Sequence, residues 1–210
     1  MWIPQNIISK PKPFSTNMNI NVAMAKPEWA SHIASLIMEA MNAECCQNFA
    51  GPSHTLADFH NMMTRLVEMD DSQYSYRNTL CALTPDGELA GICVAYDGGK
   101  LHALRERFVE AAREAFGIDY SDMDDETEAG EFYIDSLAVS TDYRGKGIAK
   151  QLLRAAIERG EALAQARVGL LVDKGNPRAE ALYNKVGFAY VNDTAWGGHP
   201  MKHLQYTTLK

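Results

Sequence analysis

A short glycine-rich basic loop, Arg144-Gly145-Lys146-Gly147, carries the clearest chemical signal in the sequence. An apolar strand pattern precedes it and a helical pattern follows, which places the loop in the first turn of a helix. The first amides of a helix have no intrahelical partner and carry the positive end of the helix dipole. Glycines let an anion approach the backbone, and Arg144 and Lys146 add positive charge. The sequence therefore predicts a phosphate-type anion site here.

Two common phosphate-binding motifs do not fit this loop. No Gly-Lys-Ser/Thr follows a four-residue spacer, so it is not a Walker loop, and the glycine spacing does not give the dinucleotide-binding fingerprint. Taken alone, Gly-Lys-Gly is also compatible with a flexible turn before a helix.

A second segment, residues 169–188, has the form of a strand followed by a short helix. Asn176 is a preferred N-cap, Pro177 fits the first helical position, and Gly187 fits the residue after the helix end. Spacings of three and four residues place one stripe on the inner face of this helix: Ala179, Leu182, Tyr183 and Val186. Without further information, Tyr183 would be a core tyrosine with a satisfied hydroxyl.

Together the two segments resemble the signatures of the GCN5-related N-acetyltransferase (GNAT) family. The letters RGKGIA at 144–149 are similar to that family's Arg/Gln-x-x-Gly-x-Gly/Ala loop, and 169–188 resembles its strand, Asn, Leu-Tyr helix and Gly-Phe. The resemblance is detailed over about 131–190, looser over 19–96, and does not account for 97–130. It implies an α/β (α+β) GNAT fold, in which helices flank both faces of a central, mixed, mostly antiparallel twisted sheet of about six or seven strands.

The resemblance also implies acetyl-coenzyme A (acetyl-CoA) as a co-substrate and requires no metal. Its pyrophosphate would rest on the amides of 144–149, and its pantetheine arm would pair with the exposed edge of the strand ending at 137–139. Asn176, in the family's matching position, would hold the arm from the other side. The donor-binding residues implied in this way are Leu137, Ala138, Val139, Arg144, Gly145, Lys146, Gly147, Ile148, Ala149, Asn176 and Tyr183.

Transfer to an amine requires two proton transfers. The amine attacks only as the free base, and the departing thiolate needs a proton donor, a role for which Tyr183 matches the family's frequent general acid. Asp135 is our first candidate for the base and Glu131 our second; each could instead be a structural hydrogen-bond acceptor. In the histone-type members the carboxylate position corresponds to Tyr133 here. Counting in twos along the strand predicts that these residues share a face: Glu131, Tyr133, Asp135, Leu137 and Val139.

The rest of the chain must supply the elements that hold these groups. Hydrophobic periodicity predicts a strand over 19–24, a helix opening at Pro27, a helix capped by Thr55, and a hairpin of 80–83 with 88–96. The residues after the glycine loop predict a helix to about Leu163.

Residues 97–130 are predicted to be an insertion with a helix in its first half. Its tail is acidic and lacks Lys and Arg, with carboxylates at Asp119, Asp122, Asp124, Asp125, Glu126, Glu128 and Glu131. One interpretation is a solvated mobile loop, and the other is attraction of a cationic acceptor amine. The net charge of −7 argues against nucleic acid as a partner.

Length and composition limit the number of domains and the cellular location that we expect. The 210 residues are 46% hydrophobic, so the chain can bury one sizeable core. We expect a single domain over 18–210 and a disordered or extraneous tail over 1–17, with Met18 as an alternative start. No apolar run approaches the length of a membrane span and residues 1–16 lack a signal-peptide pattern, so a cytoplasmic protein without a membrane partner is the expectation.

The cysteines give no sign of a metal or disulfide framework. Cys45, Cys46, Cys81 and Cys93 form no C-x-x-C pair, and we expect all four to be reduced. A Cys–His nucleophile drawn from Cys45, Cys46, His54 or His60 is disfavoured, because direct transfer needs no acyl-enzyme.

The leading functional hypothesis is an acetyl-CoA-dependent N-acetyltransferase for a primary amine of a small molecule, peptide or protein. The alternative is a non-catalytic acyl-CoA-binding regulatory module of the same fold. Residues 73–77, His102 and the acidic segment are acceptor-site candidates by location only. The oligomeric state is open, a homodimer included.

Overall fold

The computed structural model describes residues 19–208. The expectations of a tail over 1–17 and of a start at Met18 therefore lie outside the described residues. Within the described range, none of the helices combines the length and apolar character needed to cross a membrane.

A seven-stranded sheet divides the molecule, with strand order β1-β2-β3-β4-β5-β7-β6. Neighbouring strands are antiparallel except for β4 and β5, which are parallel. The prediction of a mixed, mostly antiparallel sheet is confirmed. The strands are β1 (Asn21–Met24), β2 (Thr79–Leu83), β3 (Leu89–Asp97), β4 (Glu131–Val139), β5 (Arg167–Asp173), β6 (Ala189–Trp196) and β7 (His199–Thr207).

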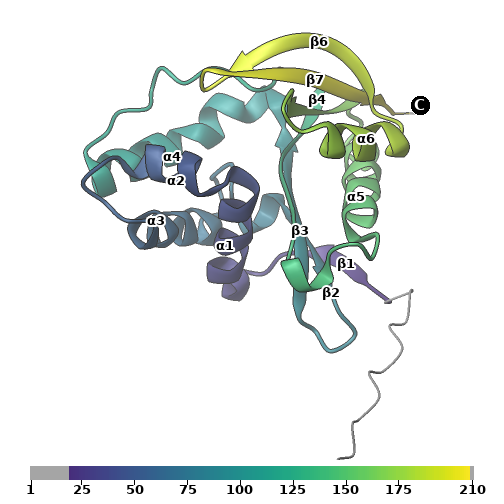
Figure 1. Cartoon of the computed structure of the whole chain (residues 1–210), viewed down its shortest axis with the longest axis horizontal. Helices are drawn as coiled ribbons and strands as arrows, with labels where there is room; N and C mark the ends of the chain where they lie inside the picture. The colour runs from purple at the N-terminus through teal and green to yellow at the C-terminus, as the bar shows by residue number, and fades with distance from the viewer. Residues whose placement is uncertain (1–18, 209–210) are drawn as a thin grey trace, which may run out of the picture.

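Helices cover both faces of the sheet, as predicted, and each face has its own apolar core. Figure 1 shows α1 to α4 on one side of the sheet and α5 with α6 on the other. Ile33, Phe59 and Phe108 belong to the first core, and Leu152 and Ile157 to the second. The helices are α1 (Ala30–Met41), α2 (Ala43–Ala50), α3 (Leu56–Glu68), α4 (Leu101–Phe116), α5 (Ile148–Ala162) and α6 (Pro177–Val186).

Capping residues explain where several helices begin. Thr55 accepts from the Asp58 amide, and Asp58 accepts from the Thr55 amide at 2.8 Å, so the predicted cap of α3 is a complete capping box. The separate helix α2 was not predicted. Asn42, with φ of 72°, caps its start, and Gly51, with φ of 75°, follows its end; these two residue types were its sequence signal.

The predicted helix of the 97–130 insertion is α4, and it holds part of the acidic segment in place. Arg105 is 4% exposed, and its guanidinium donates to the Met123 carbonyl at 3.1 Å and the Asp124 carbonyl at 2.9 Å. It also pairs with the carboxylates of Asp125 and Glu126. Glu126 is 7% exposed, so the interpretation of a wholly solvated loop is wrong for this residue.

A β-bulge at Asp135 changes the facing of β4. Ala95 of β3 lies opposite Ile134, while Val94 lies opposite Ser136, so Asp135 is an extra residue with no paired residue on β3.

The bulge corrects the alternation predicted for this strand. Phe132 and Ile134 pack in the core beneath α5 before the bulge, and after it Leu137 and Val139 pack against that same core. The predicted alternation is therefore wrong beyond Asp135. The inserted residue moves every later side chain of β4 to the opposite face of the sheet.

The two parallel strands at the centre of the sheet stay together for only four residues. β4 pairs with β5 from Glu131 opposite Arg167 to Ile134 opposite Leu170, and no further pair follows among the described residues. β5 nevertheless stays paired with β7 as far as Asp173, and β4 stays paired with β3 as far as Val139. The strands therefore part, and the predicted exposed edge at 137–139 is confirmed.

Glu131 links β4 to β7 at the end where β4 and β5 are still paired. Its buried carboxylate extends over Gly169 of β5. It accepts hydrogen bonds from His203 at 2.7 Å and Gln205 at 3.0 Å, both on β7. The Thr127 hydroxyl donates to it at 2.8 Å. A β-carbon added at Gly169 would lie 1.4 Å from Glu131 Oε1. Only glycine therefore fits at position 169 while the Glu131 side chain lies across it.

We predict that Gly169→Ala lowers the free energy of unfolding by about 3 kcal/mol, because the methyl group must displace a buried, hydrogen-bonded carboxylate. Chemical denaturation measures the loss. The double variant Gly169→Ala/Glu131→Ala should lose less than the sum of the two single variants, since removing the carboxylate relieves the clash. Additive losses would contradict this account of Gly169.

Candidate functional site

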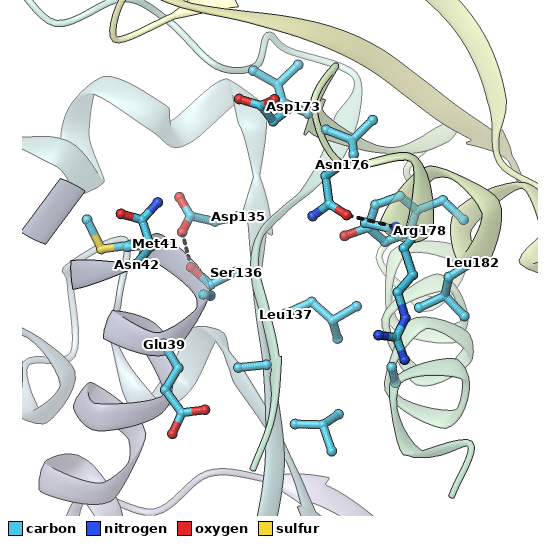
Figure 2. A pocket seen from close by; sticks show the side chains of 18 of the residues that line it. Glu39, Met41, Asn42, Asp135, Ser136, Leu137, Asp173, Asn176, Arg178 and Leu182 are labelled. Atoms are coloured by element: carbon cyan, nitrogen blue, oxygen red, sulfur yellow. Dashed lines mark hydrogen bonds between the residues drawn. The ribbon is translucent and has the colours of Figure 1, made fainter. Parts of the chain in front are cut away.

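A cleft of about 800 Å³ opens where β4 and β5 part. Its walls come from α1, β4, the glycine loop, α5, β5, α6 and the β6–β7 hairpin. Figure 2 shows Glu39 and Asp135 on one side of β4, with Asn176 and Arg178 on the other. The cleft therefore draws its walls from both faces of the sheet.

The predicted glycine loop lies in this cleft at the start of α5. Gly147 is the N-cap and the helix begins at Ile148, so the loop precedes the first turn and does not occupy it as predicted. Gly145 and Gly147 both have φ of 77°, in the left-handed region that favours glycine. A β-carbon built at either position meets no atom within 4 Å. Strain-free backbone and open space both suit close approach by an anion.

The two basic residues of the loop have different surroundings. The Arg144 guanidinium lines the cleft, where it donates to the Val139 carbonyl at 2.9 Å and pairs with Glu39 at 3.1 Å. Lys146 does not line the cleft: its ammonium donates to the Asp142 carbonyl at 3.0 Å and lies 5.0 Å from the centre of the Tyr143 ring. The structure thus gives no support to a cleft role for the Lys146 side chain.

Two further cations line the cleft that the sequence analysis missed, Lys150 and Arg178. Lys150 lies in the first turn of α5 and Arg178 in the first turn of α6, the helix whose Asn176 cap was predicted. Figure 2 shows the Arg178 side chain running along the wall of the cleft beside Leu182. A basic residue in the first turn of a helix beside an anion site was the available signal.

Asn176 and Tyr183 both line the cleft from α6. The Asn176 side-chain oxygen accepts from the Ala179 amide at 3.1 Å, which confirms the predicted N-cap, and Figure 2 shows its amide nitrogen directed into the cleft. The Tyr183 ring packs edge-on against Phe188 with centroids 6.1 Å apart. Burial raises the pKa of Tyr183 to about 12, so its hydroxyl keeps its proton at neutral pH and can donate it.

Asp135 lines the opposite side of the cleft as a half-buried carboxyl. The Ser136 hydroxyl donates to Oδ1 at 2.8 Å, while Gln73 Nε2 and the Tyr96 hydroxyl lie 3.4 Å and 3.5 Å from Oδ2. Burial and the negative charge of Glu126 raise the pKa of Asp135 to about 7, against the lowering effect of these three donors. A carboxyl that titrates near neutral pH is suited to take a proton from an amine.

The groups around Asp135 come from parts of the chain far apart in sequence. The Tyr96 hydroxyl donates to Glu126 at 2.8 Å, and Glu126 and Tyr74 also line the cleft. The side-chain oxygen of Gln73 is buried with no hydrogen-bond partner among residues 19–208. Of the acceptor-site candidates chosen by location, Tyr74 and Glu126 reach the cleft, whereas His102 does not.

The second base candidate, Glu131, lies away from the cleft. It is 0% exposed, does not contribute to the walls, and is held by Thr127, His203 and Gln205. This position favours the structural interpretation for Glu131 and favours Asp135 as the base.

The cysteines and histidines weighed as nucleophiles form no Cys–His pair. All four cysteines are free, and Cys45 is the one that lines the cleft. Burial raises the pKa of the Cys45 thiol above its ordinary value, which disfavours the thiolate. His60 is bonded to the Ser31 carbonyl at 2.9 Å and lies outside the cleft.

Asp135 gives a pH-dependence that can be tested without any ligand. Its carboxyl keeps a proton up to about pH 7 when folded but loses it near 3.8 when unfolded, so this group makes the wild type less stable as pH rises through that window. We predict that the unfolding free energy of Asp135→Asn, minus that of the wild type, increases from pH 3.8 to about pH 7 and stays constant at higher pH. Urea denaturation measures the difference, with Asp86→Asn in an exposed turn as control. A difference independent of pH would contradict the raised pKa.

Sequence and structure comparisons place the chain among acetyltransferases. The family model described as acetyltransferase (GNAT) family matches residues 45–188. No curated protein matches the chain.

Solved structures agree with this assignment. A crystal structure described as an acetyltransferase is 26% identical, with a TM-score of 0.75, 90% of this chain covered and 100% of the other. An N-acetyltransferase from Staphylococcus aureus Mu50 is 21% identical, with a TM-score of 0.72 and coverages of 89% and 100%. The NatC complex bound to Gag peptide and CoA has the same fold at 17% identity, with a TM-score of 0.54 and coverages of 90% and 99%.

The family match spans more than half of the chain, and it includes both the glycine loop and the Asn176–Gly187 helix from which the resemblance was drawn. The parted strands, the left-handed glycines of the loop and the capped helix all lie within the matched residues. The chain belongs to the GNAT family of acetyltransferases.

Proposed function

We propose that this protein transfers the acetyl group of acetyl-CoA directly to a primary amine of a small molecule, peptide or protein. The observation that carries the proposal is the cleft between β4 and β5, which joins a cationic wall on one face of the sheet to a carboxylate-bearing wall on the other. A negatively charged donor and a positively charged acceptor would enter from opposite faces and meet at the opening.

The donor would occupy the face that carries α5 and α6. Its pyrophosphate suits the amides that follow Gly145 and Gly147, with Arg144, Lys150 and Arg178 supplying positive charge around it. The unpaired edge of β4 at 137–139 offers backbone groups to the amides of the pantetheine arm. The Asn176 amide faces this edge across the cleft. The CoA held by the NatC structure supports the choice of donor.

The acceptor would occupy the face that carries α1 and α2, where Asp135 would act as the general base. A carboxylate with a pKa near 7 is present in its basic form at neutral pH and can accept the proton that the amine must lose to react. Tyr183, on the donor side of the same cleft, keeps its proton and would deliver it to the departing sulfur. Burial raises both pKa values, but only that of Asp135 comes close to neutral pH, so Asp135 can lose its proton there while Tyr183 keeps its own.

We predict that acetyl-CoA raises the melting temperature, with a stabilisation of about 3 kcal/mol at a concentration about a hundred times Kd. Gly147→Glu should reduce this shift, because a carboxylate would stand where the phosphate binds. Gly87→Glu is the matched control, since Gly87 also has a positive φ and an open surrounding but lies in the β2–β3 turn. Differential scanning fluorimetry measures both, and an unshifted wild type would argue strongly against a CoA donor.

We predict that Asp135→Asn and Tyr183→Phe each lower kcat about a hundredfold, because each removes one proton transfer. Tyr183→Phe should leave the Kd for acetyl-CoA near that of the wild type. Thiol release with a panel of amines and peptides measures turnover, and calorimetry measures donor binding. Tyr206→Phe, which changes another tyrosine packed on Phe188, is the control.

Two results of this experiment would change the assignment. A large loss of kcat in Glu131→Gln together with an unaffected Asp135→Asn would make Glu131 the base. Donor binding without turnover of any amine would favour the regulatory acyl-CoA-binding module.

A further inference from the structure

A second cavity, here called the side pocket, adjoins the acceptor end of the cleft. It has a volume of about 180 Å³ and forms where three parts of the chain converge. These are α2, the segment between α4 and β4 that carries Tyr120, and the tip of the β6–β7 hairpin. Figure 1 shows β6 and β7 arching over the molecule toward the side on which α2 and α4 lie.

The side pocket and the cleft share part of their walls. Asn42, Cys45, Trp196 and His199 line both cavities, so the pocket is the continuation of the cleft away from the glycine loop. A molecule whose reacting amine lies beside Asp135 can therefore extend its other end toward the side pocket without leaving the protein.

Three aromatic rings form much of the side pocket: Phe49, Tyr120 and Trp196. The centre of the Phe49 ring is 5.1 Å from that of Tyr120 and 6.3 Å from that of Trp196, so the rings form one cluster. The Tyr120 hydroxyl donates to the Phe49 carbonyl at 3.0 Å, which fixes that ring against α2. Clustered aromatic faces attract cations, most strongly when the cation is withdrawn from water.

The charges around the side pocket also favour a cation. Glu44 lines it and makes no ion pair with any residue in the described part of the chain, and no Lys or Arg of that part lines it. At the rim, Asp124 accepts from the Gly197 amide at 3.2 Å, which holds a second carboxylate at the hairpin tip. These carboxylates would repel an anionic tail on the acceptor and attract a cationic one.

We propose that the side pocket binds a second cationic group of the acceptor, so that the preferred substrates are diamines or related compounds with an ammonium group at each end. One ammonium would lie beside Asp135 and react, while the other would lie among the three rings and Glu44. This inference rests on the proposed function and adds the chemical class of the acceptor to it.

The test compares three series of acceptors of equal chain length: linear diamines, n-alkyl monoamines and amino alcohols. The value of kcat/KM for the best diamine should exceed that of its matched monoamine and amino alcohol by about tenfold or more, the size expected for one desolvated cation–π contact with an added carboxylate. Equal values in the three series would overturn the proposal, and so would a preference for ω-amino acids tested as a fourth series.

Variants locate the effect in the side pocket. Glu44→Gln and Trp196→Leu should each lower the ratio of diamine to monoamine kcat/KM, and Glu44→Lys should lower it further. Glu68→Gln, which removes an exposed glutamate at the end of α3, is the control and should retain the wild-type ratio. A ratio that is unchanged in Glu44→Lys would overturn the assignment of this pocket.

A separate measurement distinguishes this proposal from the proposed function. Calorimetric titration of the protein with the diamine and with the monoamine, each in the presence of CoA, reports binding without any turnover. Tighter diamine binding that Glu44→Lys abolishes would support the side pocket even if no amine were acetylated, in which case the proposed function alone would fail. Equal binding of the two amines would overturn the side pocket, whatever the turnover.

Discussion

The parting of β4 from β5 after four residue pairs is the constraint on which the rest of the site depends. Each strand keeps its outer partner, β4 with β3 and β5 with β7, so the sheet remains intact on both sides of the opening. Glu131 fixes the closed end, because its carboxylate crosses Gly169 and ties β4 to β7. The bulge at Asp135 lies at the point where the strands separate, and the Asp135 carboxyl lines the cleft there. Without the opening, no cleft could draw its walls from both faces of the sheet.

The same opening explains the division of charge within one cleft. Arg144, Lys150 and Arg178 stand on the face where two helices begin, and those helix starts carry partial positive charge of their own. Glu126 and Asp135 stand on the other face. If both sets shared a single wall they would pair with one another and neutralise the site. β4 separates the two sets, and the ion pair of Arg144 with Glu39 is a direct contact between the two sides that lines the cleft.

Local sequence signals predicted the parts of the site that depend on local physics. The glycine loop, the Asn176 cap and the inward stripe of α6 each depend on residues within a few positions of one another, and all three are present. The bulge could not be read from the sequence, since it depends on how β3 and β4 align, and it invalidated the simple alternation along β4. The surroundings of Asp135 were equally hidden, because Gln73, Tyr96 and Glu126 come from three separate elements.

The acidic insertion shows why charge counted along a sequence can mislead. Its carboxylates suggested a solvated loop, yet one of them, Glu126, is buried where Arg105 can neutralise it. An arginine does not lose its proton in proteins, so a full positive charge lies beside the Glu126 carboxylate. Burial is the main cause of the raised pKa of Asp135, and the nearby negative charge of Glu126 raises it further. The insertion thus acts on the site through one buried charge, while α4 contributes its apolar face to the core beneath.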